Sequence, residues 1–262
     1  MYFLYLFAAI LPAVLLVIYV YKQDQFPEPP KIVFKTFLFG CAAILGVELI
    51  IPFLDEYSKN HFQGETYHFF QEFIRAAFVE EFFKACVIIF YCTRKTAFDE
   101  PMDGIVYGIA ASLGYAAYEN TQYVLYVLQE PSFNVALERA FTAIPMHALC
   151  GVIMGFLISQ SIFQKTHNYL NLFLAIFIPV GMHGLYNYSF TSDLISYQIA
   201  YLILLVFLIR AYLIFKNLKK QQKQSIMFHK RNYEITLTSF LNATTTALII
   251  YLSLNYMINL II

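Results

Sequence analysis

Charged residues are scarce in this sequence of 262 residues. They make up 13% of it, whereas a soluble domain carries about 25%. Tryptophan is absent, and the formal net charge is zero, so nothing in the composition favours a nucleic-acid partner. With 60% hydrophobic residues, the composition excludes a soluble globular domain and predicts a polytopic protein embedded in a lipid bilayer.

Cysteine is also sparse, and neither a metal knuckle nor a disulfide framework is visible. The four cysteines lie in or at the ends of apolar runs, which suits a packing role; they are Cys41, Cys86, Cys92 and Cys150. No internal repeat and no polar stretch long enough for a soluble domain is present. Residues 1–262 are therefore predicted to form a single integral membrane domain.

Apolar runs of about 20 residues, the length that crosses a bilayer, predict the fold. Eight such runs occur, at residues 2–21, 32–54, 67–92, 103–129, 138–162, 169–190, 197–215 and 236–261. The predicted fold class is all-α, a polytopic bundle of about eight transmembrane helices.

Lysine and arginine are unevenly divided between the two sets of predicted loops. Twelve of these basic residues lie in or beside the loops that follow the first, third, fifth and seventh runs. Only two, Lys59 and Arg139, lie in or beside the remaining loops. By the positive-inside rule, the lysine-rich loops are cytoplasmic. The sequence therefore predicts a multi-pass protein of the plasma membrane with both termini extracytoplasmic.

Three charged residues stand in the third run, where a membrane-spanning helix normally has none. Glu80 and Glu81 are adjacent, and Lys84 follows at a helical spacing that lets it reach either carboxylate. Each such charge costs about 2.5–3.5 kcal/mol near the bilayer centre on insertion scales. Other parts of the protein must therefore compensate these charges.

The next three runs supply polar residues at a similar depth, namely Glu119, Asn120, His147, His183 and Asn187. At 1.5 Å per residue, the glutamate pair, Glu119 and the two histidines lie about 18–24 Å from the cytoplasmic ends of their spans. Four consecutive spans thus place polar groups in one layer, in the outer half of the membrane. Glycines four residues apart, Gly104 with Gly108 and Gly151 with Gly155, predict close helix packing nearby.

This layer suits hydrolysis of a peptide bond. Two carboxylates in a low dielectric cannot both ionise cheaply, which leaves one as a general base for water, with imidazoles and an amide to orient it. Three alternatives stay open at this point. The same residues suit a proton-coupled transporter, a zinc site without the His-Glu-x-x-His signature, or a catalytically silent scaffold that binds membrane partners.

The motifs occur in a specific order along the chain. They are Glu80-Glu81-x-x-Lys84, Asp103-Gly-Ile-Val-Tyr-Gly, Tyr115-Ala-Ala-Tyr-Glu119-Asn120, His147 and His183-Gly-Leu-Tyr-Asn187. This order resembles the PrsW family of intramembrane endopeptidases, with a motif-bearing core at about residues 67–190. The sequence is more distantly similar to the CAAX prenyl proteases, which represent the zinc-dependent alternative. Lys84 and Ala143 depart from the CAAX pattern.

The resemblance implies a glutamic-type membrane protease that cleaves a single-span membrane protein, such as an anti-sigma factor, near the extracytoplasmic side. The implied catalytic residues are Glu80, Glu81, His147, His183 and Asn187, and the implied supporting residues are Lys84, Glu119 and Asn120. No metal or other cofactor is expected, because the lysine disfavours a cation beside the glutamates.

Within the glutamate pair we expect only one carboxylate to face the histidines. Adjacent residues point about 100° apart on a helix. We expect Glu80 to face His147 and His183 as the base, and Glu81 to adjust its charge or to pack against a neighbouring span.

Overall fold

The computed structural model describes residues 2–127, 130–164, 168–223 and 245. All regular secondary structure in these residues is helical, which confirms the predicted all-α fold class. The helices are α1 (Tyr2–Tyr21), α2 (Pro30–Ala42), α3 (Ile44–His61), α4 (Gly64–Phe69), α5 (Val79–Val87), α6 (Pro101–Gln122), α7 (Phe133–Phe141), α8 (Ala143–Phe163), α9 (Asn168–Thr191) and α10 (Gln198–Lys223).

The described helices follow the first seven predicted runs, although several runs are divided into shorter helices. Among the described residues, five segments are long and apolar enough to cross a membrane: Tyr2–Tyr21, Pro30–His61, Phe133–Phe163, Asn168–Thr191 and Gln198–Lys223. The eighth predicted run, at 236–261, lies outside the described residues. The molecule is thus a multi-pass helical membrane protein, and the exact count of eight stays a prediction.

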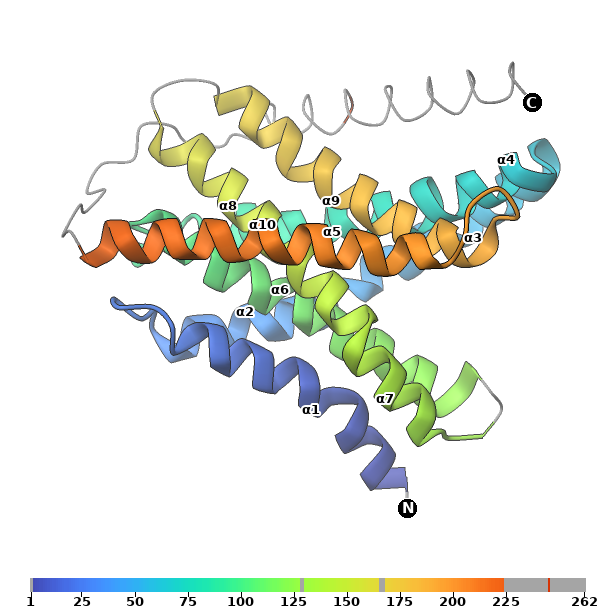
Figure 1. The fold of residues 1–262 in the computed structure, drawn as a ribbon, viewed down its shortest axis with the longest axis horizontal. Helices are drawn as coiled ribbons and strands as arrows, with labels where there is room; N and C mark the ends of the chain where they lie inside the picture. The colour runs from blue at the N-terminus through green and yellow to red at the C-terminus, as the bar shows by residue number, and fades with distance from the viewer. Residues whose placement is uncertain (1, 128–129, 165–167, 224–244, 246–262) are drawn as a thin grey trace.

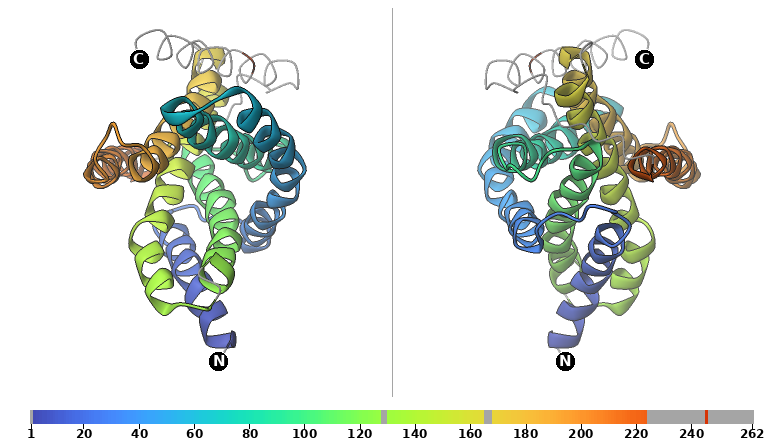
Figure 2. Two further views of the ribbon diagram at one scale, coloured as in Figure 1. Left: turned by 90° about the vertical axis from the view of Figure 1, so that its right-hand side faces the viewer. Right: turned by 90° about the vertical axis from the view of Figure 1, so that its left-hand side faces the viewer.

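Helix α6 is the centre of the bundle (Figures 1 and 2). It packs against α1, α2 and α8, and every residue from Pro101 to Ala117 is buried. A helix that is buried on all sides belongs to the interior of a protein rather than to its lipid-facing surface. Residues on α6 are therefore placed for a site enclosed by other helices.

Glycines bring α6 and α8 into backbone contact. A Cβ atom on Gly104 would meet the carbonyl oxygen of Gly155, and one on Gly108 would meet that of Gly151. The two predicted glycine pairs therefore face each other across one interface. Only residues without a side chain allow such an approach.

By contrast, α10 lies along the outside of the bundle, against α9 and α8 (Figures 1 and 2). Its exposed large side chains include Tyr201, Leu202, Leu205, Leu208, Ile209, Tyr212 and Leu213. Such a surface is suited to contact with lipid.

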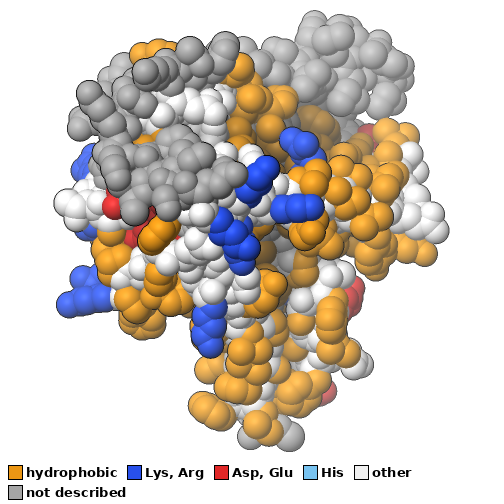
Figure 3. Space-filling model, turned by 60° about the vertical axis from the view of Figure 1, so that its left-hand side comes forward, with side chains coloured by type: hydrophobic (Ala, Val, Ile, Leu, Met, Phe, Trp, Pro, Cys, Tyr) orange, Lys and Arg blue, Asp and Glu red, His pale blue; other side chains and the backbone are white. Residues whose placement is uncertain are grey.

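The helix connections fall on two opposite sides of the molecule. The α1–α2 connection and the end of α10 lie on the left in Figure 1, whereas the α3–α4 and α9–α10 connections lie on the right. With the left-hand side turned forward, Figure 3 shows lysine and arginine side chains gathered among hydrophobic surface. The arrangement agrees with alternating spans, and the assignment of the lysine-rich side to the cytoplasm stays a prediction.

Candidate active site

Helix α5 carries the glutamate pair and Lys84 and is wound differently from its flanks. The chain is a π-helix over Phe70–Phe78 before it and over Ile88–Cys92 after it. π-helical turns are rare, and they occur frequently at functional sites. The helix that bears the charged residues therefore differs from an ordinary membrane span.

Lys84 is the hub of the site. Its fully buried ammonium donates to Glu81 Oε1 at 2.8 Å and lies 3.4 Å from Glu80 Oε2. It also lies 2.9 Å from Nδ1 of His147, and 4.2 Å from the centre of the Tyr115 ring. One lysine thus contacts both members of the glutamate pair and a histidine from α8.

The contacts of His147 define its tautomer. A lysine ammonium can only donate, so Nδ1 of His147 accepts and the ring proton is assigned to Nε2. That Nε2 lies 3.1 Å from Glu119 Oε2, which accepts the hydrogen bond. His147 therefore connects Lys84 of α5 to Glu119 of α6.

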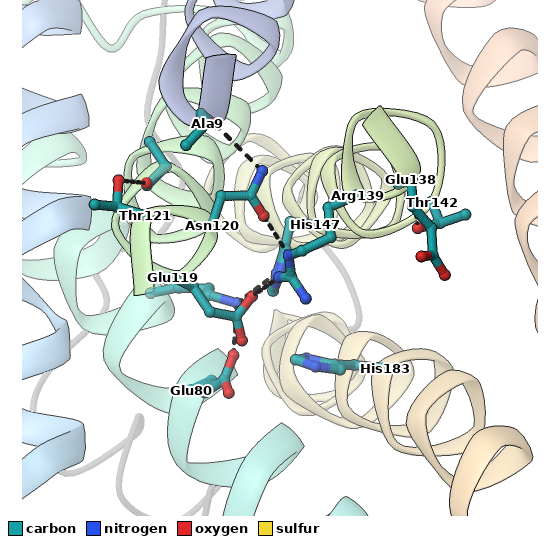
Figure 4. A network of polar contacts seen from close by, with 12 residues as sticks. Ala9, Glu80, Glu119, Asn120, Thr121, Glu138, Arg139, Thr142, His147 and His183 are labelled. Atoms are coloured by element: carbon teal, nitrogen blue, oxygen red, sulfur yellow. Dashed lines mark hydrogen bonds and ion pairs between the residues drawn. The ribbon is translucent and has the colours of Figure 1, made fainter. Parts of the chain in front are cut away.

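His183 completes the group from α9. Its Nδ1 lies 2.9 Å from Glu81 Oε1 and donates to it, since a carboxylate accepts. The rings of His183 and His147 are nearly perpendicular, with centroids 5.2 Å apart. Figure 4 shows Glu80, Glu119 and the two histidines converging from four helices.

Arg139 of α7 is a member of the site that sequence reasoning missed. Its Nη2 donates to Glu119 Oε2 at 2.5 Å, and its Nε donates to Asn120 Oδ1 at 2.6 Å (Figure 4). Asn120 in turn donates to the carbonyl of Ala9 at 3.3 Å. The available signal was that Arg139 is one of only two basic residues in the predicted outer loops, eight positions before His147.

The structure corrects the expected division between the two glutamates. Glu81 does not turn away to a neighbouring span, because it hydrogen-bonds directly to His183. Oxygen atoms of Glu80 and Glu81 and nitrogen atoms of His147 and His183 all lie within 4.8 Å of one another. The 100° separation was a poor guide because two flexible side chains swing toward the same lysine.

Asn187 lies one helical turn beyond His183 on α9 and is half-buried. Its amide makes no hydrogen bond with any other described residue. The structure thus brings seven residues into direct contact and leaves Asn187 beside them. We call these seven the active-site cluster: Glu80, Glu81, Lys84, Glu119, Arg139, His147 and His183.

The sequence of this chain is also similar to those of known proteins. The family model described as "PrsW family intramembrane metalloprotease" matches residues 28–212. The chain belongs to the PrsW family.

Relatives of the PrsW family cover most of this chain. A "Protease PrsW" of Oceanobacillus iheyensis is 32% identical over 198 residues, which are 73% of this chain and 88% of the relative. One of Clostridioides difficile is 30% identical over 218 residues, or 82% and 89%. One of Bacillus subtilis is 32% identical over 202 residues, or 76% and 88%. No solved structure gives a significant match.

Membership of the PrsW family makes this chain a membrane-embedded peptidase, and it favours that activity over the transporter and scaffold alternatives. The matched residues 28–212 contain the whole active-site cluster.

Proposed function

We propose that this peptidase is an intramembrane endopeptidase that hydrolyses a peptide bond with a water molecule activated by Glu80. The observation that carries the proposal is the convergence of two carboxylates, a lysine and two histidines inside a helical bundle. Such a set supplies a base, a fixed positive charge and groups that orient water, which are the requirements for direct hydrolysis.

Glu80 is better suited than Glu81 to act as the base. Glu81 is fully buried, and its Oε1 accepts hydrogen bonds from both Lys84 and His183. Glu80 retains 6% exposure, and its contact with Lys84 is the longer one at 3.4 Å. A base must be free to accept a proton from water, and Glu80 is the less restrained carboxylate.

In the proposed reaction, Glu80 takes a proton from water while the water oxygen attacks the scissile carbonyl carbon. The C–N bond then breaks as the tetrahedral intermediate collapses, and the proton passes from Glu80 to the leaving amine. Nε2 of His183 makes no hydrogen bond with a described residue and, with the ring proton on Nδ1, can accept a hydrogen bond from the water. The amide of Asn187 can donate to the oxyanion. Glu81, Lys84, Glu119 and His147 hold these groups in position.

Because the family description contains the word metalloprotease, we tested whether the residues of the active-site cluster could hold a metal ion. Glu80, Glu81, His147 and His183 are acceptable zinc ligands by type, and their donor atoms lie close together. The ammonium of Lys84, however, is within hydrogen-bond distance of three of these four residues. A dication in the same place would meet that positive charge, so the arrangement does not fit a metal and we assign no step to one.

Chelation tests metal independence. The purified full-length protein should cleave its substrate at the same rate before and after dialysis against EDTA. Loss of cleavage that zinc restores, together with retained folding by circular dichroism, would instead establish a metal-dependent reaction with a displaced Lys84.

The proposed substrate is a single-span membrane protein, such as an anti-sigma factor, cut near the extracytoplasmic side of the plasma membrane. The outer-half depth predicted for the polar layer supports this choice. The test is to incubate the purified protein with a panel of single-span proteins in liposomes and to locate cleavage by mass spectrometry. Cuts confined to soluble domains or to the cytoplasmic end would contradict the proposal.

The proposed topology has both termini extracytoplasmic. A reporter fused after Ile262 should be active outside the cytoplasm, and one inserted after Lys223 should be active inside. The opposite pattern would reverse the orientation and place the active-site cluster in the inner half of the membrane.

A further inference from the structure

A second group of buried carboxylates lies far from the active-site cluster. Asp24 is 8% exposed, Glu28 3%, Glu100 6% and Asp103 0%, and we call these four the acidic cluster. Asp103 precedes Glu119 by 16 residues on α6, which corresponds to about 24 Å along the helix axis. The acidic cluster joins the α1–α2 connection to the start of α6.

Asp24 uses one oxygen for hydrogen bonds and leaves the other without a partner. Its Oδ1 accepts from the backbone of Phe26 at 3.0 Å and from Nε2 of Gln222 at 2.6 Å. The same amide of Gln222, near the end of α10, also donates to Glu100 Oε1. Oδ2 of Asp24 is buried and has no hydrogen-bond partner.

Asp103 likewise has one carboxylate oxygen that accepts hydrogen bonds and one that accepts none. Its Oδ2 accepts from the backbone N–H groups of Asp99 and Glu100, both at 2.7 Å. Its Oδ1 is buried and has no hydrogen-bond partner. Glu28, in turn, accepts from the hydroxyl of Tyr107. Two buried carboxylate oxygens therefore lack the donor that such atoms normally have.

The acidic cluster itself contains no basic residue, and its hydrogen-bond donors are backbone amides, Gln222 and Tyr107. Lys219, which lies on the same helix as Gln222, donates to Gln23 at 2.8 Å. Buried charges of one sign require a counter-ion or protons.

The spacing of the oxygens fits one metal ion. One carboxylate oxygen from each of Asp24, Glu100 and Asp103 lies within 4.8 Å of the other two. Oxygens bound to one Ca²⁺ at 2.3–2.6 Å are at most about 5 Å apart, and those bound to Mg²⁺ are at most about 4.2 Å apart. The donors are all oxygens, which selects a hard divalent cation over zinc.

We propose that Asp24, Glu100 and Asp103 bind one hard divalent cation, Ca²⁺ or Mg²⁺, at a site separate from the active-site cluster. Each of the three residues supplies one carboxylate oxygen, and Asp24 and Asp103 each have an oxygen, Oδ2 and Oδ1 respectively, that no donor among the described residues occupies. Bound there, the ion fastens the end of α1 to the start of α6, and Gln222 extends the link to α10.

Thermal unfolding of the full-length protein in detergent tests the site. After chelator treatment, CaCl₂ or MgCl₂ should raise the melting temperature of the wild type. Asp24→Asn and Asp103→Asn should abolish the rise, because an amide keeps the hydrogen-bond acceptor but loses the charge. Glu80→Gln should show the same rise as the wild type, which separates this site from the active-site cluster.

Direct binding of ⁴⁵Ca²⁺, with unlabelled Mg²⁺ as competitor, distinguishes the two ions. Each Asn variant should weaken the apparent affinity by at least about tenfold. In chelator the Asn variants should melt no lower than the wild type, since they remove like charge, and that result shows that they fold. A wild type that binds neither ion and melts alike with and without them would overturn the proposal and indicate shared protons.

Discussion

The active-site cluster and the acidic cluster solve the same physical problem in different ways. Both bury several carboxylates inside or at the edge of a membrane bundle. In the active-site cluster, Lys84, Arg139 and the histidines donate to one oxygen of each carboxylate, so the donors include fixed positive charges, although Oε2 of Glu81 has no partner among the described residues. In the acidic cluster, backbone amides, Gln222 and Tyr107 are the donors.

The active-site cluster is therefore preorganised, because basic side chains of the protein balance its carboxylates. The acidic cluster is not, because its carboxylates accept hydrogen bonds from backbone amides and neutral side chains. A buried carboxylate paired with a fixed cation stays ionised without outside help, which a base needs during turnover. A buried group of carboxylates with neutral donors depends on an added ion or on protons. The first arrangement is suited to catalysis, and the second is suited to binding.

The largest effect should come from the base itself. Removal of a general base typically costs a factor of about 10²–10⁴ in rate, so Glu80→Gln should be almost inactive in a cleavage assay. Glu81→Gln should retain more activity, because Glu81 positions Lys84 and His183. Glu138→Gln changes an exposed carboxylate that directly precedes Arg139 on α7 and is the matched control. An inactive Glu81→Gln beside an active Glu80→Gln would reverse the assignment.

Lys84→Met would make the active-site cluster resemble the acidic one, with carboxylates that lack their buried cation. Breaking a buried ion pair costs about 3–5 kcal/mol, and unfolding in SDS–detergent mixtures measures it. The double variant Lys84→Met with Glu81→Gln should recover part of the loss. Unchanged stability of the single variant would show that Lys84 does not compensate the glutamates.

Substitution of Arg139 tests whether an ion pair also stabilises the outer part of the active-site cluster. Arg139 and Glu119 have side chains 15% and 18% exposed, so Arg139→Gln should cost less than Lys84→Met, roughly 2–3 kcal/mol. A double-mutant cycle with Glu119→Gln isolates the pairwise energy. Additive losses would mean that the close contact contributes nothing measurable.

The smallest effect concerns Glu65, a carboxylate outside the spans with neutral donors only. Burial opposes its charge, but hydrogen bonds from Ser192, Tyr188 and the backbone of Asp193 outweigh burial and lower its pKa below 4.5. Its stabilisation is therefore complete above about pH 5 and is lost as the pH falls through the lowered pKa. Glu65→Gln should cost at most about 1 kcal/mol at pH 7, and this cost should shrink as the pH falls through the lowered pKa. A cost independent of pH would exclude this explanation.

Local spacing explains which parts of the site the sequence could predict. The contact of Lys84 with both glutamates follows from helical periodicity, and the common depth of Glu119, His147 and His183 follows from the rise per residue. The facing glycine pairs were equally visible. Each of these inferences needs only one helix or the fixed thickness of a bilayer.

Long-range contacts explain what the sequence could not predict. Arg139 reaches Glu119 only because α7 folds back beside α6, and Asp24 meets Gln222 across 198 positions of sequence. The π-helical flanks of α5 have no compositional signature. Asp24 and Glu100 lie in connections that are 76 positions apart in the sequence, so only the fold shows that they lie together with Asp103.

The glycine contacts between α6 and α8 also restrict how a substrate reaches the active-site cluster. The proposed function requires a single-span substrate to reach the active-site cluster from the lipid, through a gap between two helices. Backbones that touch at Gly104, Gly108, Gly151 and Gly155 leave no room for a third chain. Similar contacts of Gly40 and Gly114 close the path between α2 and α6. Under the proposed function, the substrate must therefore enter at another helix boundary, because the glycine contacts hold α6 against α8 and α2 against α6.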